Sequence, residues 1–221
     1  MHSTLLIDNL YLTITIREPY HLTMLFDMHV HTRFSPCSII RIRQIIKRAR
    51  EVGLDGICIT DHDTVASKRE FEKIADAHGI CVIIGTEYTT PKGDILIYGP
   101  VDNLPLWLDA EHLLQWIRKE GGVAVPAHPF RKERPANQHI LHASDIIESM
   151  NARNRPSENE LCRKWLQEHG NGKREIGGSD AHTLEELGRI VTVFEKDITN
   201  SETLIHELKY GKYHPLQRFS F

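Results

Sequence analysis

The chain has 221 residues, of which 40% are hydrophobic and 26% charged, so it is long enough to bury one sizeable core. Its formal net charge of −3 argues against a surface that binds nucleic acid through bulk positive charge, but leaves room for a short oligonucleotide in a cleft. No apolar run approaches the roughly 20 residues of a membrane-spanning helix, so we expect no membrane association.

The four cysteines, at positions 37, 58, 81 and 162, form no close pair. This pattern is typical of reduced thiols and predicts a cytoplasmic protein. Cys37 follows the first pair of histidines, and we interpret it as a loop thiol, with a ligand or nucleophile role as the alternative.

Residues 1–23 differ from the rest of the chain. Two short strands are expected there, at residues 5–7 and 10–16, and we interpret the segment as an N-terminal extension of uncertain role. The remaining residues, 24–221, show no composition break and are expected to form a single domain.

From residue 24, apolar runs of strand length alternate with segments of helical periodicity. The expected strands cover residues 25–30, 55–60, 80–85, 95–98, 122–127, 145–149, 174–178 and 190–194, and the expected helices cover residues 39–53, 65–78, 109–120, 157–169, 184–188 and 201–211. Such alternation favours an α/β fold with a parallel sheet wound by helices. About seven parallel strands fit a barrel one unit short of the usual eight, and an open sheet is the alternative. Residues 129–142 form the longest polar connection and are expected to shape or cover a site.

Several apolar runs end directly in residues that bind divalent metals. These residues are His29, His31, Asp61, His62, Glu87, His128, Asp180 and His182. Each pair by itself is common in a chain with 14 histidines, but all of them follow strand-like runs, where barrels and wound sheets have their active sites. Five imidazoles and three carboxylates are too many for one tetrahedral ion and suit two or three. Mixed nitrogen and oxygen ligands fit Zn²⁺, Mn²⁺ or Fe.

Two further acids in these runs are given supporting roles. Asp27 is expected to orient a ligand imidazole from behind, and Asp63 to cap the helix that follows.

These blocks resemble the PHP (polymerase and histidinol phosphatase) family, in its order, over residues 24 to about 215. The matching motifs are Asp-Met-His-Val-His-Thr (27–32), Thr-Asp-His-Asp (60–63), Gly-Thr-Glu (85–87), Ala-His-Pro (127–129) and Gly-Ser-Asp-Ala-His (178–182). The resemblance implies a distorted (β/α)₇ barrel over 24–221 that hydrolyses phosphoesters with the help of two or three divalent ions. Histidinol-phosphate phosphatases of the family often have another His several residues after the first pair, and residues 33–38 contain none.

The resemblance also implies how the ligands are shared. His29, His31, Glu87 and Asp180 would hold one ion, with Glu87 bridging, and His62 and His128 would hold a second. Asp61 with His182 would complete the cluster or a third ion. Asp61 and His182 are also expected to take part in catalysis. Five loop arginines suit a substrate phosphate: Arg33, Arg131, Arg134, Arg153 and Arg155.

The sequence therefore predicts a metal-dependent hydrolase that acts on a small phosphomonoester, a nucleotide or an oligonucleotide end through a water activated by the ions. Two alternatives stay open. One is a C–N or lactone hydrolase, since the same site can attack a carbonyl carbon, and the other is a non-catalytic, metal-stabilised module of a larger complex. No obligate protein partner is evident.

Overall fold

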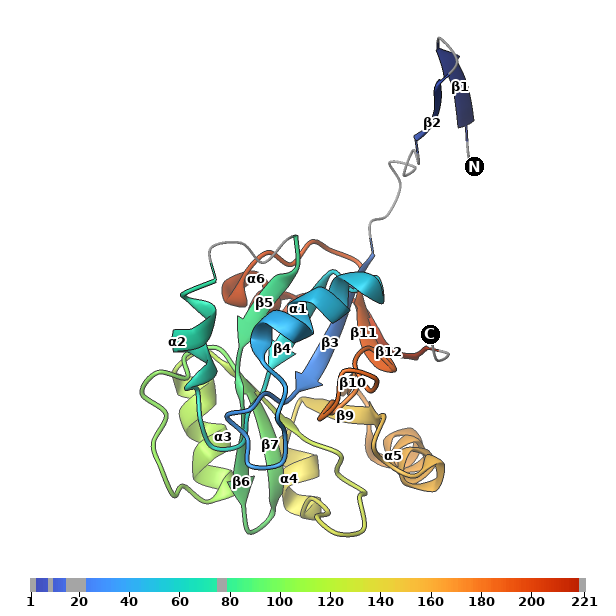
Figure 1. Cartoon of the computed structure of the whole chain (residues 1–221). Coiled ribbons are helices and arrows are strands. Elements are labelled where there is room, and N and C mark those ends of the chain that lie inside the picture. The colour runs from blue at the N-terminus through green and yellow to red at the C-terminus, as the bar shows by residue number, and fades with distance from the viewer. Residues whose placement is uncertain (1–2, 8–9, 15–22, 75–78, 219–221) are drawn as a thin grey trace.

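A computed structural model describes residues 3–7, 10–14, 23–74 and 79–218 (Figure 1). The strands are β1 (Ser3–Ile7), β2 (Leu10–Ile14), β3 (Met24–Val30), β4 (Gly56–Ile59), β5 (Cys81–Ile84), β6 (Thr86–Thr90), β7 (Gly93–Tyr98), β8 (Val123–Pro126), β9 (Ile146–Asn151), β10 (Arg174–Gly178), β11 (Ile190–Phe194) and β12 (Tyr213–Gln217). The helices are α1 (Ile42–Glu51), α2 (Ser67–Phe71), α3 (Ala110–Lys119), α4 (Gln138–Ala143), α5 (Pro156–His169) and α6 (Ser201–Tyr210). No described helix is long and apolar enough to cross a membrane.

The largest sheet has five strands in the order β12-β11-β3-β4-β5. Its strands β3, β4 and β5 are parallel, as predicted, but β11 runs antiparallel to both β3 and β12. The sequence did not predict β12, because Pro215 cannot donate a ladder hydrogen bond. As an edge strand, β12 tolerates that missing donor.

A second sheet, β6-β7-β8, is antiparallel, so the prediction of a wholly parallel arrangement is wrong here as well. Strand β6 was also not predicted, since only one residue separates it from the end of β5. Gly85 lies between them, and a Cβ atom at that position would lie 2.4 Å from the carbonyl oxygen of Ile97. Only glycine permits this close approach of the backbones.

The parallel pair β9-β10 and the hairpin β1-β2 complete the sheets. The described strands thus form four separate hydrogen-bonded sheets and not one continuous ladder. Other hydrogen bonds connect three of these sheets: the Tyr98 hydroxyl of β7 donates to the Met28 carbonyl of β3 at 2.8 Å, and the Gly177 amide of β10 donates to Thr192 Oγ1 of β11 at 2.9 Å. The fold is therefore mixed α/β.

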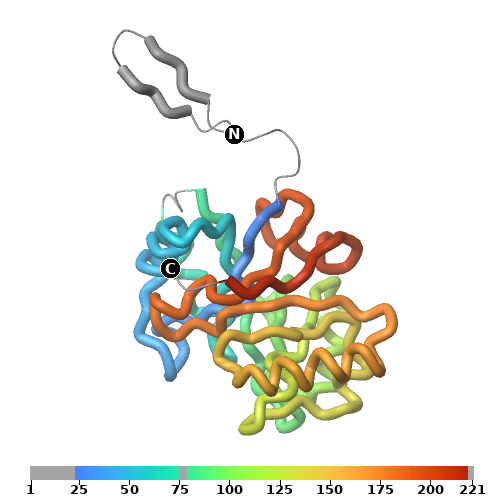
Figure 2. The backbone as a smooth tube through the Cα atoms, turned by 90° about the vertical axis from the view of Figure 1, so that its right-hand side faces the viewer, coloured from blue at the N-terminus to red at the C-terminus, as the bar shows by residue number. Residues whose placement is uncertain are grey.

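Helices cover the outside of these sheets (Figure 1). The buried face of α1, which includes Ile42 and Ile45, packs with Val30 of β3 and Ile57 of β4. Helix α3 packs through its buried residues on the sheet that contains β6 and β7, and α5 lies beside β9 (Figure 2). Helices α1 and α3 are amphipathic, and burial of their apolar faces stabilises the sheets beneath them.

Three sequence predictions about helices need correction. The helix expected over 65–78 is the shorter α2, and residues 75–78 lie outside the described part of the chain. Residues 184–188 form turns and not a helix, because Gly188 has a left-handed backbone (φ 77°) and its amide donates to Asp27 Oδ2 at 2.8 Å. The polar connection 129–142 contains the start of α4, which Asn137 caps by accepting from the His139 amide.

The two strands expected near the N-terminus are confirmed as β1 and β2, and residues 15–16 lie outside the described residues. That residues 1–23 are a separate extension stays a prediction.

Candidate metal centre

Seven of the eight predicted ligands come together where the strands end. His29 lies in β3 and Glu87 in β6, and the others directly follow strands: His31, His62, His128, Asp180 and His182. Most of these side chains are fully buried, whereas His62 and His182 are 29% and 12% exposed. The cluster therefore has a buried inner part and an outer edge that solvent reaches.

Glu87 is at the middle of this cluster. Its Oε2 atom lies 3.2 Å from the Nε2 atoms of His29 and His31 and 3.2 Å from Nδ1 of His62. Its Oε1 atom lies 2.9 Å from Nε2 of His128. The two oxygens of one carboxylate thus contact two different sets of imidazoles.

The partners of the imidazoles assign their tautomers. Nδ1 of His29 donates to Glu148 Oε1 at 3.0 Å. Nδ1 of His31 lies 3.0 Å from Ser35 Oγ, which already donates to Asp61 Oδ1 at 2.8 Å and therefore accepts from His31. Both rings consequently present their Nε2 lone pairs to the inner cluster.

Those lone pairs face other electron-rich atoms. The Nε2 atoms of His29 and His31 are 3.0 Å apart, and they lie 3.6 and 3.3 Å from Asp180 Oδ1. Such a set is repulsive unless a proton or a cation lies among its atoms. Ligands about 2.0–2.1 Å from a tetrahedral ion are roughly 3.3 Å from one another, so the group fits a divalent ion such as Zn²⁺.

The electrostatics of the inner cluster agree with this reading. Burial alone would lower the pKa of His29, but the carboxylates of Asp180, Glu148 and Glu87 outweigh burial and raise it well above its usual value. Burial would raise the pKa values of Glu87 and Asp180, yet the neighbouring histidines hold both well below their usual range. The site is therefore built for anionic carboxylates close to positive charge.

A second group consists of Glu87, His128 and Asp94, whose ligand atoms all lie within 4.8 Å of one another. Asp94 was not among the predicted ligands, because the segment Pro91-Lys92-Gly93-Asp94 is typical of a solvent-exposed turn. In the structure Asp94 is the second residue of β7 and is fully buried. Burial and the nearby Glu87 raise its pKa to about 6.

A third group lies at the outer edge and consists of Cys37, His62, His182 and the shared His31. Nε2 of His182 is 2.9 Å from Sγ of Cys37. Burial lowers the pKa of His62, and burial with the charge of His31 lowers that of His182 to about 4, so both rings are neutral at pH 7. Partial burial raises the pKa of the Cys37 thiol.

The three groups differ from the predicted assignment of ligands to individual ions. His62 and His128, which were expected to hold one ion together, contact different oxygens of Glu87 and belong to different groups. Sequence spacing carries no information about which carboxylate oxygen an imidazole reaches.

Asp61 is the predicted ligand that the structure does not bring into the cluster. Its Oδ1 accepts from the Thr32 amide at 2.7 Å and from Ser35 Oγ, and its Oδ2 accepts from Thr32 Oγ1 at 2.7 Å. Through Ser35 it fixes the ring of His31. The geometry therefore favours a positioning role over the predicted ligand and catalytic roles.

Two other acids also differ from expectation. Asp27 was expected to orient an imidazole, but it accepts from the backbone amides of His29, Ser179 and Gly188, and its burial raises its pKa to about 6. Asp63 was expected to cap a helix, but it accepts from the Thr89 amide at 2.7 Å.

Glu148 performs the task that was assigned to Asp27. It accepts from Nδ1 of His29 and, at 2.6 Å, from the backbone amide of His128. An acid within the apolar run 145–149 was a signal for this role, since a buried carboxylate needs partners.

Two of the predicted phosphate-binding arginines are engaged with carboxylates of the cluster. Arg131 donates to Asp180 Oδ2 at 2.7 Å and to Asn151 Oδ1 at 2.9 Å. Arg134 donates to Asp94 Oδ1 at 2.5 Å. Both therefore neutralise and orient candidate ligands.

The other three arginines pair with glutamates outside the cluster, and their side chains are 41–65% exposed. Arg33 is paired with a glutamate of α2 at 2.8 Å, and Arg155 lies 3.8 Å from a glutamate of the 129–142 connection. Arg153 has only a long contact of 4.0 Å with Glu186, and its charge contributes to the low pKa of His182. Among the five, Arg153 thus combines proximity to the outer edge with the loosest pairing.

The backbone turns sharply where two ligands follow their strands. His128 and Asp180 have left-handed conformations, with φ of 30° and 54°. Such conformations are unfavourable for residues other than glycine and cost of order 1 kcal/mol each. Among the described residues, Asp63 and Trp107 are the other non-glycine residues with positive φ.

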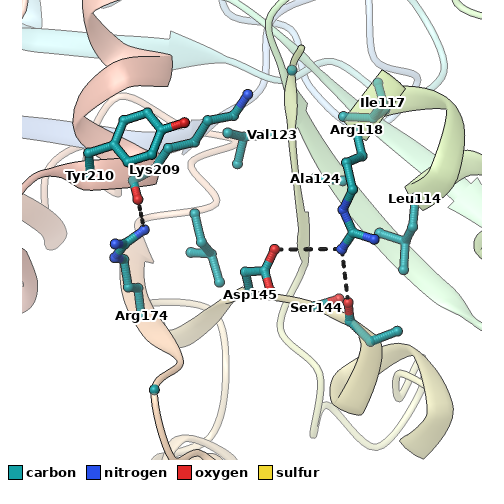
Figure 3. Close-up of a pocket in the computed structure, with 14 residues that line it drawn as sticks. Leu114, Ile117, Arg118, Val123, Ala124, Ser144, Asp145, Arg174, Lys209 and Tyr210 are labelled. Atoms are coloured by element: carbon teal, nitrogen blue, oxygen red, sulfur yellow. Dashed lines mark hydrogen bonds and ion pairs between the residues drawn. The ribbon is translucent and has the colours of Figure 1, made fainter. Parts of the chain in front are cut away.

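A separate pocket of about 480 Å³ lies away from this cluster, at the beginnings of β8 and β9 (Figure 3). Its basic side chains are used internally: Arg118 lies 3.5 Å from Asp145 Oδ2, and Arg174 donates to the carbonyl of Lys209. The cations lie near the C-terminal ends of α3 and α6, where positive charge stabilises helices.

Comparison with known proteins identifies the family of the chain. The family model "PHP domain" matches residues 27–206. An uncharacterised protein of Methanocaldococcus jannaschii, MJ1587, is 32% identical over 114 residues, which cover 47% of this chain and 67% of that protein.

Two solved structures share the fold. A two-domain protein of Bacteroides vulgatus, described as containing a predicted PHP-like metal-dependent phosphoesterase, is 17% identical with a TM-score of 0.65, over 90% of this chain and 66% of that one. Endonuclease Q, in complex with a 27-mer duplex carrying an abasic lesion, is 16% identical with a TM-score of 0.71, over 87% of this chain and 58% of that one. The family model matches residues 27–206, which make up most of the chain, and the chain therefore belongs to the PHP domain family.

Proposed function

We propose that this protein is a metal-dependent phosphoesterase that hydrolyses a small phosphomonoester, a nucleotide or an oligonucleotide end. One observation carries the proposal: Glu87 presents one oxygen to His29 and His31 and the other to His128. A carboxylate shared in this way is what a site for two neighbouring ions requires.

The proposed ligand sets follow the three groups of side chains. His29, His31, Asp180 and Glu87 would hold one ion, and Glu87, Asp94 and His128 a second. His62 and His182 lie at the outer edge, where a third position is open to solvent. When bound, divalent ions lower the pKa of water and stabilise the negative charge of phosphoryl oxygens.

The protein's own residues would orient the ligands and receive the substrate. Glu148 and Arg131 hold His29 and Asp180 in place through charge-assisted hydrogen bonds. The substrate would approach from the side of His62 and His182, since these are the exposed members of the cluster. Arg153 is the arginine placed to meet its phosphate.

The family and the two neighbouring structures support this class of reaction. One neighbour is described as a metal-dependent phosphoesterase and the other is a nuclease bound to DNA. The hydrogen bonds that link the three sheets of β3, β7 and β10 also support the distorted (β/α)₇ barrel that the family resemblance implies. A metal-ion hydrolase acting on C–N or lactone bonds is the competing assignment.

The test compares chelator-stripped protein with protein reloaded with Mn²⁺, Zn²⁺ or Fe²⁺. Substrates should include phosphomonoesters, nucleotides, short oligonucleotides, amides and lactones. We expect phosphate release only from reloaded protein, and at least about a 100-fold loss in Glu87→Gln, since even outer partners of metal ligands contribute 10–100-fold. Glu160→Gln on the surface of α5 is the matched control. Hydrolysis of amides or lactones alone, or no turnover with all three metals, would refute the proposal.

A further inference from the structure

Cys37, His62 and His182 bring three different strand ends to one point at the outer edge of the cluster. Cys37 lies in the connection after β3, His62 follows β4 and His182 follows β10. Their ligand atoms, with that of His31, lie within 4.8 Å of one another. The ring centroids of His62 and His182 are 4.6 and 4.4 Å from that of His31.

Cys37 and His182 are not among the ligands proposed for the two inner ions. Nδ1 of His182 donates to the carbonyl of Asp180 at 2.8 Å, so its Nε2 atom carries a lone pair directed to Cys37 Sγ. Cys37 is exposed, and this contact with His182 is its only side-chain hydrogen bond among the described residues. The sulfur of Cys37 is therefore available to bind a metal ion.

We propose that Cys37 is a thiolate ligand of a third metal position, which it forms with His62 and His182. This inference rests on the proposed metal-dependent function and adds to it a preference for a particular kind of metal. One sulfur and two imidazole nitrogens make three protein ligands, which leaves a fourth position open as in catalytic sites. A divalent cation deprotonates a coordinating thiol, because it is the largest local charge, and this overrides the effect of burial on Cys37.

The sulfur ligand distinguishes this position from the two inner ones. Carboxylates and imidazoles accept Mn²⁺, Fe²⁺ and Zn²⁺ alike, whereas a thiolate favours Zn²⁺, Co²⁺ and Cd²⁺ over Mn²⁺. The outer position should therefore hold Zn²⁺ when the inner positions hold another metal. The Cys37 thiol should also lose its reactivity towards alkylating reagents when a thiophilic ion is bound.

The test titrates full-length, chelator-stripped protein with Co²⁺ and with Cd²⁺. We expect near-ultraviolet absorption from a thiolate–metal bond, together with alkylation of Cys37 by iodoacetamide that slows at least about tenfold once Cd²⁺ is bound. Cys37→Ser should lose the absorption and one equivalent of metal. Cys37→His should lose the absorption but keep that equivalent, and Cys81→Ser should behave as the wild type.

The outcomes separate this proposal from the one on which it rests. Metal binding without the absorption band would overturn the role of Cys37, and so would a band that persists in Cys37→Ser. Neither result would contradict the two inner metal sites. Protein that binds no ion at all would refute both.

Discussion

Replacing Glu148 by glutamine tests how much of the metal affinity comes from residues that never touch the metal. Glu148 uses both oxygens: Oε1 accepts from His29, and Oε2 accepts from the His128 amide at 2.6 Å and from Asn151 Nδ2 at 3.2 Å. A glutamine has one carbonyl oxygen, so its amide group must face one of these donors. At least one charge-assisted hydrogen bond is lost.

The magnitude follows from that bond. Hydrogen bonds to charged groups contribute about 1.5–3 kcal/mol, and removing a partner leaves a buried donor unsatisfied. Since 1.4 kcal/mol corresponds to about a factor of ten, we expect metal affinity to fall about 10- to 100-fold. The metal-free protein should also unfold more easily, by about 1–3 kcal/mol.

The assay is competition for Zn²⁺ against a chromophoric chelator, combined with urea unfolding of metal-free protein. Glu158→Gln is the matched control, because Glu158 is also buried and accepts from two backbone amides, those of Lys132 and Arg155, but contacts none of the candidate ligands. The control should lose stability and keep its metal affinity. Unchanged affinity in Glu148→Gln, or an equal loss in both variants, would show that this reasoning is wrong.

Three further predictions concern other parts of the site. Asp94→Asn should bind one ion fewer by elemental analysis while the group around His29 stays loaded, and an unchanged metal content would remove Asp94 from the ligands. Arg131→Met leaves the buried Asp180 carboxylate without its cation, so metal-free protein should lose about 3 kcal/mol in urea unfolding and the metal-loaded protein less, and equal losses would contradict this reading. Gly178→Ala would place a Cβ atom 2.5 Å from Cβ of His29, so the melting temperature should fall in both states, and a wild-type melting curve would show that β3 and β10 can separate without cost.

The sequence was sufficient to predict most of the side chains that come together in the cluster, because strand periodicity and position were informative together. Histidines directly after apolar runs converged as expected, as the distances around Glu87 show. Asp94 and Glu148 were missed because each is a single acid beside an apolar run, a pattern that also describes a turn or a solvent-facing position. Asp61 was predicted as a ligand because its neighbour His62 has the same local context, and only the contacts with Thr32 and Ser35 distinguish the two residues.

The fold was predicted less completely for a similar reason. Strand direction depends on which strands pair, and periodicity does not encode this. The antiparallel pairings of β7 with β8 and of β11 with β3 therefore differ from the expected parallel arrangement.

The left-handed backbone at His128 and Asp180 has a consequence for engineering. Glycine adopts these conformations without penalty, but replacing either residue by glycine would also remove a buried side chain and its hydrogen bonds, which for Asp180 include the one from Arg131. The strain of order 1 kcal/mol that glycine would relieve is smaller than the cost of about 3 kcal/mol for breaking that buried ion pair, so a search for stabilising glycine substitutions should leave both positions unchanged.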